Sequence, residues 1–323
     1  MGIALLLGII ISIFLGQFSI NPKELFGIIF SQIADIKPFW TDQQEHVFWT
    51  IRLPRVVLAC LVGTALSTAG AVYQSVFENP MAAPDFLGAS SGAALGAALA
   101  IILGFSGGLI TLLAFAFSMA TIILVYFVGN RTKGNKTVGL VLAGLMISSI
   151  AQAGTSFIKL VADQTNELPA ITYWLMGSLS AVTPKDLLFA AIVIIIGVIP
   201  MFILGWKINV LTIGEQEAMT MGISVSRVRL VSLVAATLVT AAAVSVSGMI
   251  GWVGLVVPHF CRKIVGNNFK YLLPASVLTG ALFLLLVDDV SRNLFTVEIP
   301  IGILTAVIGA PFFIYLITRG GED

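Results

Sequence analysis

The sequence predicts an all-α, polytopic membrane protein with about ten transmembrane helices, and three observations support this fold class. Of the 323 residues, 58% are hydrophobic and only 10% are charged. The mean hydropathy is +1.03, whereas a soluble chain carries about 25% charged residues. The apolar residues also gather in runs close to the length of about 20 residues that a helix needs to span a bilayer. Lipid is therefore expected to surround most of the chain.

Ten apolar runs, bounded by charged residues, Pro or Gly, are the predicted membrane helices. They lie at roughly 3–19, 56–77, 87–104, 108–129, 137–161, 187–205, 230–247, 249–260, 272–290 and 301–318. The third and eighth runs are short or rich in Gly. The first run lacks the basic region and the small-residue cleavage site of a secretory signal, so we expect it to be a membrane helix.

The distribution of basic residues predicts the orientation of these helices. Ten helices place both termini on one side, and the positive-inside rule places that side in the cytoplasm. The inner loops then hold Arg131, Lys133, Lys136, Lys207, Arg227, Arg229, Arg262, Lys263, Lys270 and Arg319. The outer side holds Lys23, Lys37, Arg52, Arg55, Lys159, Lys185 and Arg292. The chain, 1–323, is expected to be a single domain in the cytoplasmic (inner) membrane.

Two segments between the apolar runs are polar. Residues 20–55, with Trp40 and Trp49, are predicted to form an outer loop with interfacial aromatic side chains. Residues 206–229 contain IGEQEAMTMGISVSRVR, which predicts two short cytoplasmic helices joined at Gly222, between the sixth and seventh membrane helices. Its acids come first and its basic residues last, as helix dipoles favour. The segment is either a contact site for another protein or a solvated connector.

Two other segments interrupt the helical pattern. The first, ENPMAAPDFLG, contains Asn79, Pro80 and Pro84, which break a helix and leave backbone groups in need of partners. The second, GMIGWVGLVVPHFCRK, contains several Gly residues and Pro258. Irregular backbone at membrane depth is tolerated where it is buried in protein or lines water. We therefore expect the first segment, and the second as its counterpart, to lie beside a pathway.

Charged residues near the predicted outer surface are expected to form ion pairs or to bind a partner. Asp288 and Asp289 are expected to pair with Arg292 or with a neighbouring helix, since they lie at a helix end rather than at the midplane. Arg52 and Arg55 flank a proline where the second helix begins. The acceptors for these arginines are lipid phosphate, acids of the same chain, or carboxylates of an external partner, which arginine binds through two parallel hydrogen bonds.

Several classes of function find no support in the sequence. It contains no GxxxxGK[ST] phosphate-binding loop and no HExxH or GxSxG motif, so ATP hydrolysis would require another subunit. With two Cys and two His, a metal site built by this chain is not expected. The formal net charge of +1 gives no reason to expect a nucleic-acid partner.

Four blocks of sequence, in order, resemble permeases of the FecCD type, which carry iron-siderophores, haem and cobalamin. The blocks are RLPRVVLACLVGTALSTAGAVYQSVFENPMAAPDFLGASSGAALG, GEQEAMTMGISVSRVR, GMIGWVGLVVPHFCRKIVG and EIPIGILTAVIGAPFFIYLI. The resemblance leaves out only the first fifty or so residues and the segment near 162–186. This sequence differs from the usual pattern of the family at two positions, with Met81 in place of a common Leu and Trp252 in place of a more usual Phe.

The resemblance implies a type II ABC importer: two copies of this chain in the lipid membrane, two ATP-binding subunits that carry ATP and Mg, and a periplasmic or lipoprotein binding protein outside. The chain itself would bind no cofactor. By position, the residues that would couple to the ATPase are Glu215, Gln216, Ala218, Met221 and Gly222. Those that would dock the binding protein are Arg52, Arg55 and Arg292. Those that would form the cytoplasmic gate are Asn79, Met81, Thr137 and Val138.

The expected cargo is a metal chelate, first an iron-siderophore, with cobalamin or haem as alternatives, since small and apolar walls suit a bulky chelate. An ATP-independent secondary transporter is the competing class and would need ionisable residues at the midplane. A membrane enzyme would need a cluster of catalytic side chains. A neighbouring reading frame that encodes an ATPase would favour the importer.

Overall fold

The computed structural model describes residues 1–16, 18–33, 37–132, 136–181 and 183–319, and within them every regular element is a helix. In chain order the elements are α1 (Gly2–Phe14), α2 (Pro22–Phe30), α3 (Asp42–His46), a π-helix (Val47–Arg52), α4 (Leu53–Val76), the 3-10 helix η2 (Pro84–Leu87), α5 (Ala89–Ile102), α6 (Gly108–Gly129), α7 (Lys136–Val161), α8 (Glu167–Met176), α9 (Pro184–Ile203), α10 (Gly205–Leu211), α11 (Glu215–Thr220), α12 (Val225–Ser247), α13 (Val253–Val265), α14 (Phe269–Asn293) and α15 (Ile301–Arg319).

Each of the ten predicted runs coincides with a helix of the structure: α1, α4, α5, α6, α7, α9, α12, α13, α14 and α15. Among the described residues, six helices are long and apolar enough to cross a membrane, and α1, α5 and α15 are shorter apolar helices. The polytopic all-helical fold is therefore confirmed. The count of ten crossings and the side on which the termini lie stay predictions.

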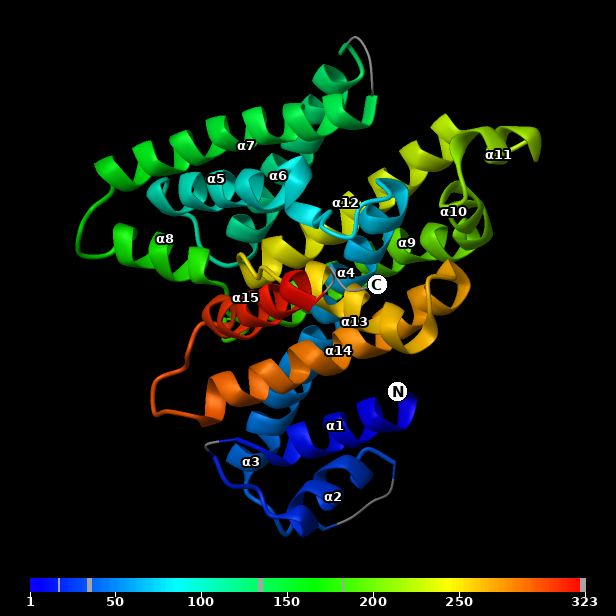
Figure 1. Cartoon of the computed structure of the whole chain (residues 1–323). Helices are drawn as coiled ribbons and strands as arrows, with labels where there is room; N and C mark the ends of the chain where they lie inside the picture. The colour runs from blue at the N-terminus through cyan, green and yellow to red at the C-terminus, as the bar shows by residue number, and fades with distance from the viewer. Residues whose placement is uncertain (17, 34–36, 133–135, 182, 320–323) are drawn as a thin grey trace.

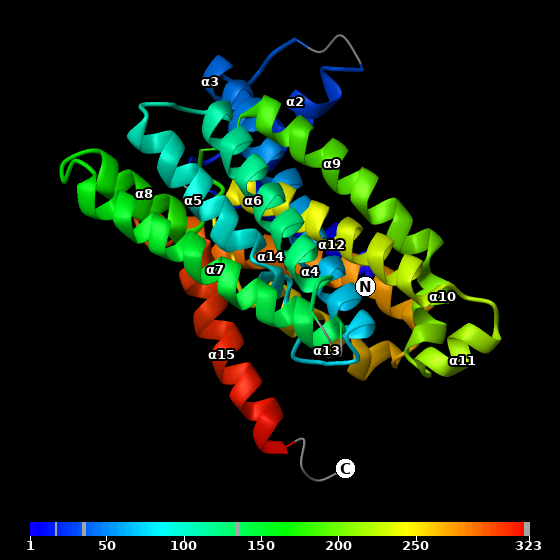
Figure 2. The same cartoon turned by 90° about the horizontal axis from the view of Figure 1, so that it is seen from above.

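The helices form one elongated bundle, in which α10 and α11 lie at the end opposite α8 (Figure 1). Under the predicted orientation the α11 end is cytoplasmic, and we call it the inner end and the α8 end the outer end. Figure 2 shows α15 leaning away from the rest of the bundle. It is a peripheral helix in the single chain.

The centre of the bundle is built from α4 and α12. In the most apolar windows of these two spans, 78% and 72% of residues are buried, against 28% in both α6 and α9. Small residues allow the central backbones to approach closely, as is usual for helices packed in lipid. A Cβ atom at Gly63 would clash with the carbonyl oxygen of Gly280 on α14, and one at Gly70 with that of Gly254 on α13. Glycine is therefore required at both crossings.

Both interrupted segments predicted from the sequence are irregular in the structure. After α4 the chain leaves helical geometry at Glu78, whose φ is +49°, and returns through η2 to α5. After α12 it passes through Gly248, with a φ of +69°, and Trp252, with a φ of +71°. A positive φ is rare for a bulky residue and marks a conformation that the surrounding packing imposes.

The polar N-terminal segment is more ordered than an outer loop. It contains α2, α3 and the π-helix. Residues of α2 and of the π-helix contribute to a separate apolar cluster of Ile20, Leu25, Ile28, Trp40 and Phe48. Helix α3 is joined to α2 by a hydrogen bond that the Gln44 amide group donates to Glu24. Trp40 is 8% exposed, and its indole N–H donates to Glu45. The prediction of interfacial aromatic side chains is therefore wrong for Trp40, which is part of a small core.

The segment 206–229 contains one of the two predicted short helices at the expected place. That helix is α11, and the turn after it passes through Gly222 with a φ of +76°. The second predicted helix is not separate, because α12 begins at Val225 and continues for 23 residues. An additional helix, α10, precedes α11.

Candidate functional site

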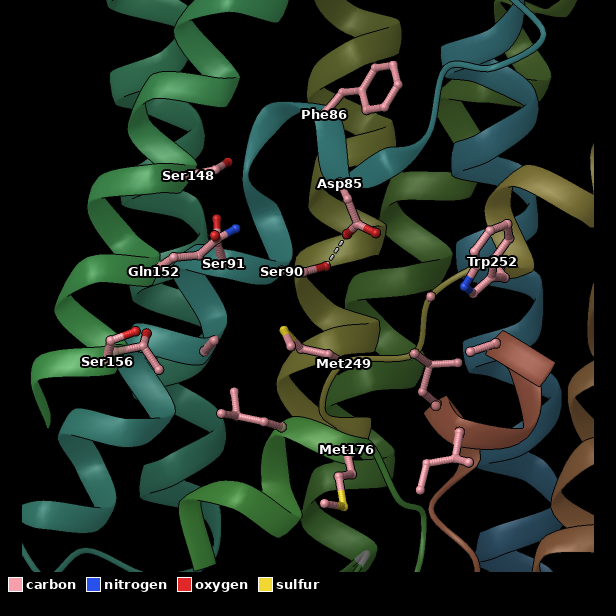
Figure 3. A pocket seen from close by; sticks show the side chains of 18 of the residues that line it. Asp85, Phe86, Ser90, Ser91, Ser148, Gln152, Ser156, Met176, Met249 and Trp252 are labelled. Atoms are coloured by element: carbon pink, nitrogen blue, oxygen red, sulfur yellow. Dashed lines mark hydrogen bonds between the residues drawn. The ribbon is translucent and has the colours of Figure 1, made fainter. Parts of the chain in front are cut away.

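A cavity of about 920 Å³ lies between the two interrupted segments and the helices α5, α7, α8 and α15. Its lining residues are Asp85, Phe86, Ser90, Ser91, Ala94, Leu145, Ser148, Gln152, Thr155, Ser156, Lys159, Leu175, Met176, Met249, Ile250, Gly251, Trp252, Gly302, Ile303, Ala306 and Val307. The segments that the sequence singles out as lying beside a pathway thus face the same space, although more than 150 residues separate them. Figure 3 shows the side chains that converge on it.

One wall of the cavity is polar. The lining residues of α7 follow the spacing of a single helix face, and five of them carry a polar group: Ser148, Gln152, Thr155, Ser156 and Lys159. Ser90 and Ser91 extend this polar surface onto α5. The expectation of small and apolar walls is therefore wrong for this side.

The opposite wall is apolar and is built around Trp252. Its indole packs over Gly309 of α15, where a Cβ atom would lie 2.6 Å from the Cβ of Trp252, and its ring centroid is 6.3 Å from that of Phe313. Met249, Ile250 and side chains of α15 complete the wall. The Trp in place of the more usual Phe therefore faces the cavity, in a position to touch a cargo.

Asp85 enters this cavity near the middle of the bundle. A Cβ atom at Gly254 would lie 2.8 Å from the carbonyl oxygen of Leu66, near the centre of α4, and 2.8 Å from Cδ of Pro84. The residue next to Asp85 is therefore at the depth of the centre of α4. The Oδ1 atom of Asp85 accepts a hydrogen bond from the Ser90 hydroxyl group (Figure 3). An ionisable residue at this depth is a candidate for function.

The residues expected at the cytoplasmic gate lie on the two elements that meet at the inner side of the cavity. The Oδ1 atom of Asn79 accepts a hydrogen bond from the backbone N–H of Met81 at 2.9 Å, which fixes the turn after α4. Met81 is 46% exposed and Val138, at the start of α7, is 53% exposed. The side chain of Thr137 lies outside the described residues. The gate role of these residues stays a prediction.

The expected coupling residues lie on and after α11. Ala218 is fully buried and anchors the helix, whereas Gln216 and Met221 are exposed. The carboxylate of Glu215 forms an ion pair with the Arg229 guanidinium group on α12. A pocket of about 390 Å³ lies between α11, α12, α6 and α7. The helix is thus tied to the base of α12 and presents its remaining side chains to the inner side.

The three arginines expected to dock a binding protein are buried, with exposures of 4% for Arg52, 7% for Arg55 and 6% for Arg292. Arg55 binds Asp288 at 2.9 Å and Glu298 at 2.7 Å. Arg292 binds Asp289 and the hydroxyl group of Ser12. Local pairing of the two aspartates is therefore confirmed.

Arg52 donates to backbone carbonyl oxygens at the end of α1 and just beyond it, Ile13 at 2.9 Å and Phe18. Acceptors within the chain thus account for all three arginines. Their role in docking an external partner stays a prediction. Among the described acids that pair with these arginines, Glu298 is the one whose side chain is partly exposed, at 31%.

The model of the FecCD transport family matches residues 4–319 of this sequence. The chain belongs to the FecCD transport family. Its members named below are permease subunits of ABC transporters, so this permease is a multi-pass protein of the inner membrane, and ATP hydrolysis belongs to a separate subunit.

Relatives of this FecCD permease carry the names of different cargoes. It is 37% identical to the molybdate import system permease protein MolB of Haemophilus influenzae, over 100% of this chain and 96% of the relative. It is 44% identical to a probable iron chelatin transport system permease protein of Helicobacter pylori, over 83% of this chain and 81% of the relative. Members of one family are thus named for different cargoes.

A solved structure described as an inward-facing conformation of a metal-chelate type ABC transporter has the same fold. It aligns with a TM-score of 0.87 and 34% identity, over 98% of this chain and 97% of the other. The FecCD permease fold observed here is thus shared along its whole length.

Asp85 is not among the site residues predicted from the sequence. It lies within the first interrupted segment, which was already expected to border a pathway, and it is the acid of that segment's central part. An acidic residue between two helix-breaking prolines and a Gly-rich helix was the available signal. What the sequence could not give was its depth, which depends on how η2 folds back against α4 and α7.

Proposed function

We propose that this permease forms the translocation path of an ATP-driven importer that carries a metal chelate across the inner membrane. An iron-siderophore is the expected cargo, with cobalamin or haem as alternatives. The observation that supports this function is the 920 Å³ cavity between the two interrupted segments. Its size lies in the upper part of the range of about 300–1,000 Å³ for small-molecule sites. A chelate is the kind of ligand that would use this space.

The proposed assembly contains a second copy of the chain. One side of the cavity is bordered by α7 and α15, which carry exposed apolar residues outside the cavity lining, such as Leu142, Met146, Ile150 and Ile308. A second copy placed against these helices would close the cavity and cover those faces. Two ATP-binding subunits, with ATP and Mg, would sit against α11, and a binding protein would deliver cargo at the outer end.

The proposed contact with the ATP-binding subunits uses α11 and the turn after it. Met221 is 55% exposed and follows a helix whose buried Ala218 and Glu215–Arg229 ion pair connect it to α12. Because α12 leads to the second interrupted segment, a push on α11 would reach the cavity wall. For the binding protein we propose an indirect role of the three arginines. Arg52, Arg55 and Arg292 would hold the outer helix ends in place, and the binding protein would contact those ends.

One observation favours the alternative of a secondary transporter, which would need an ionisable residue at the midplane: the acid Asp85 lies near the middle of the bundle. Uptake measurements separate the two classes. Cells that produce the chain, its ATP-binding subunit and its binding protein should accumulate a radioactive ferric siderophore. Replacing the phosphate-loop Lys of the ATP-binding subunit should abolish this uptake.

Uptake that survives loss of ATP hydrolysis, or that dissipating the proton gradient abolishes while ATP is held constant, would contradict the importer mechanism. Parallel assays with cobalamin, haem and molybdate would identify the cargo. Accumulation of none of the three chelates, or of molybdate alone, would contradict the proposed chelate function.

A further inference from the structure

We propose that Asp85 is a specificity-determining residue of the cavity, which favours a cargo that presents hydrogen-bond donors and disfavours a bare oxyanion. The favoured class is a metal chelate whose organic part carries hydroxyl or amide groups. The inference rests on the proposed function, because it concerns the cargo of the same cavity. It separates the two cargo classes that the names of the relatives leave open, an iron chelate and molybdate.

The first step of the argument is the place of the carboxylate. Asp85 projects into the cavity from η2, with the polar side chains of α7 on one side and Trp252 on the other (Figure 3). The neighbouring Pro84 and Gly254 pack at the depth of Leu66, near the centre of α4. A cargo that uses the cavity therefore passes close to this acid.

The second step is its hydrogen bonding. The Ser90 hydroxyl group donates to Oδ1 of Asp85. An ionised carboxylate accepts hydrogen bonds and donates none, and it has about four acceptor positions. One Ser90 bond leaves acceptor capacity directed at the cavity. A ligand that donates from hydroxyl or amide groups can use that capacity, whereas an oxyanion has only acceptor atoms to offer.

The third step is the balance of charge along the cavity. Lys159 is the other charged lining residue, at the outer end of α7. It lies eleven residues beyond Ser148, about 16 Å along the helix axis at 1.5 Å per residue. A Cβ atom at Gly88, just after η2, would lie 2.8 Å from the Ser148 hydroxyl oxygen, so Ser148 marks the depth of η2. Lys159 can thus attract an anion to the entrance without neutralising Asp85.

The selection follows from these three steps. The hydroxyl and amide groups of Ser148, Gln152 and Ser156 can donate to a cargo and accept from it, so they do not distinguish the two classes. Asp85 does, because its negative charge repels an anion that approaches it and attracts the donor groups of a neutral ligand. A neutral ferric trihydroxamate or an amide-bearing cobalamin suits the site. Molybdate, a dianion, does not.

The test measures binding to the purified complex of this chain with its ATP-binding subunit, without the binding protein, so that the cavity alone selects. The probes are a neutral ferric trihydroxamate labelled with radioactive iron, and labelled molybdate. Asp85→Asn keeps the size of the side chain and removes its charge. Glu78→Gln is the matched control, because Glu78 is exposed and outside the cavity lining.

We expect Asp85→Asn to weaken trihydroxamate binding on the order of tenfold, the usual effect of losing a hydrogen bond to a charged acceptor. The same variant should bind molybdate at least tenfold more tightly than the unmodified complex. Glu78→Gln should change neither affinity by more than twofold. Asp85→Ala, tested alongside, should also gain molybdate binding.

Any of four results would overturn the inference. Both affinities could be unchanged in Asp85→Asn, or Glu78→Gln could change them equally. The unmodified complex could bind molybdate at least as tightly as the trihydroxamate, or it could bind neither probe. If cells with the unmodified importer still take up the ferric siderophore in an ATP-dependent way, the proposed function stands while the inference falls. Absence of ATP-dependent uptake of the siderophore, of cobalamin and of haem would instead remove the proposed function.

Discussion

Replacing Arg55 should destabilise the protein far more than replacing the arginine of an exposed ion pair. The Arg55 guanidinium group donates to both carboxylate oxygens of Asp288, at 2.9–3.2 Å, and to Glu298 at 2.7 and 3.0 Å. Asp288 is fully buried, with a side-chain exposure of 0%. Arg55→Ala would leave this carboxylate with Arg292, whose Nε is 3.7 Å away.

The expected cost follows from this burial. Removing one partner of a buried ion pair costs about 3–5 kcal/mol, because the other charge stays desolvated. The remaining contact with Arg292 should bring the loss toward the lower end of this range. Arg229→Ala is the matched comparison, since it breaks a pair whose side chains are 17% and 48% exposed, and it should cost below about 1 kcal/mol.

The assay is thermal or denaturant unfolding of the purified protein in detergent, followed by tryptophan fluorescence. Arg55→Ala should unfold at a much lower temperature than Arg229→Ala, and adding Asp288→Asn to Arg55→Ala should recover part of the loss. Equal effects of the two single replacements, or no recovery in the double variant, would refute the reasoning from burial. The result also decides how docking studies are read, because a loss of binding in Arg55→Glu would reflect unfolding.

Three further changes test other parts of the structure. Gly70→Ala should force α13 away from α4 and lower the free energy of unfolding by about 1–3 kcal/mol, the usual cost of an overpacked contact. Gly108→Ala, where a Cβ atom has space, should change the stability little, and equal shifts of the two variants in unfolding scans would contradict this. Met221→Arg should leave the purified chain folded and abolish uptake, and normal uptake would argue against coupling through the exposed turn. Exchanging the charges of the Glu215–Arg229 pair should restore the transport that either single reversal lowers, whereas additive losses in uptake assays would show that the pair does not act as a unit.

Much of the secondary structure could be predicted because it depends on local properties. Apolar runs of sufficient length form helices in lipid wherever they occur, since every backbone group must find a partner within the helix. Helix α11 was also predictable from its acids and the glycine after it. The second short helix was not, because nothing in the stretch after Gly222 stops α12 from extending to Val225.

Helices α2 and α3 depend on contacts rather than on local sequence. Residues of α2 pack in a cluster with Trp40 and Phe48, and α3 is held to α2 by the hydrogen bond from Gln44 to Glu24. Neither helix is long enough to be stable alone. The sequence therefore showed the aromatic residues without showing that they face inward. The same limit applied to α8, in a segment that matched no motif.

By itself, the sequence determined membrane residence, the positions of the main helices, the two interrupted segments and, through its motifs, the family. These properties follow from composition, run length and residue type, which do not require knowledge of the fold. Only the tertiary structure decided the partners of the arginines, since Arg55 meets acids 233 and 243 residues away. It also decided that Asp85 faces the cavity near the depth of the centre of α4, because depth depends on how a broken segment folds back between packed helices.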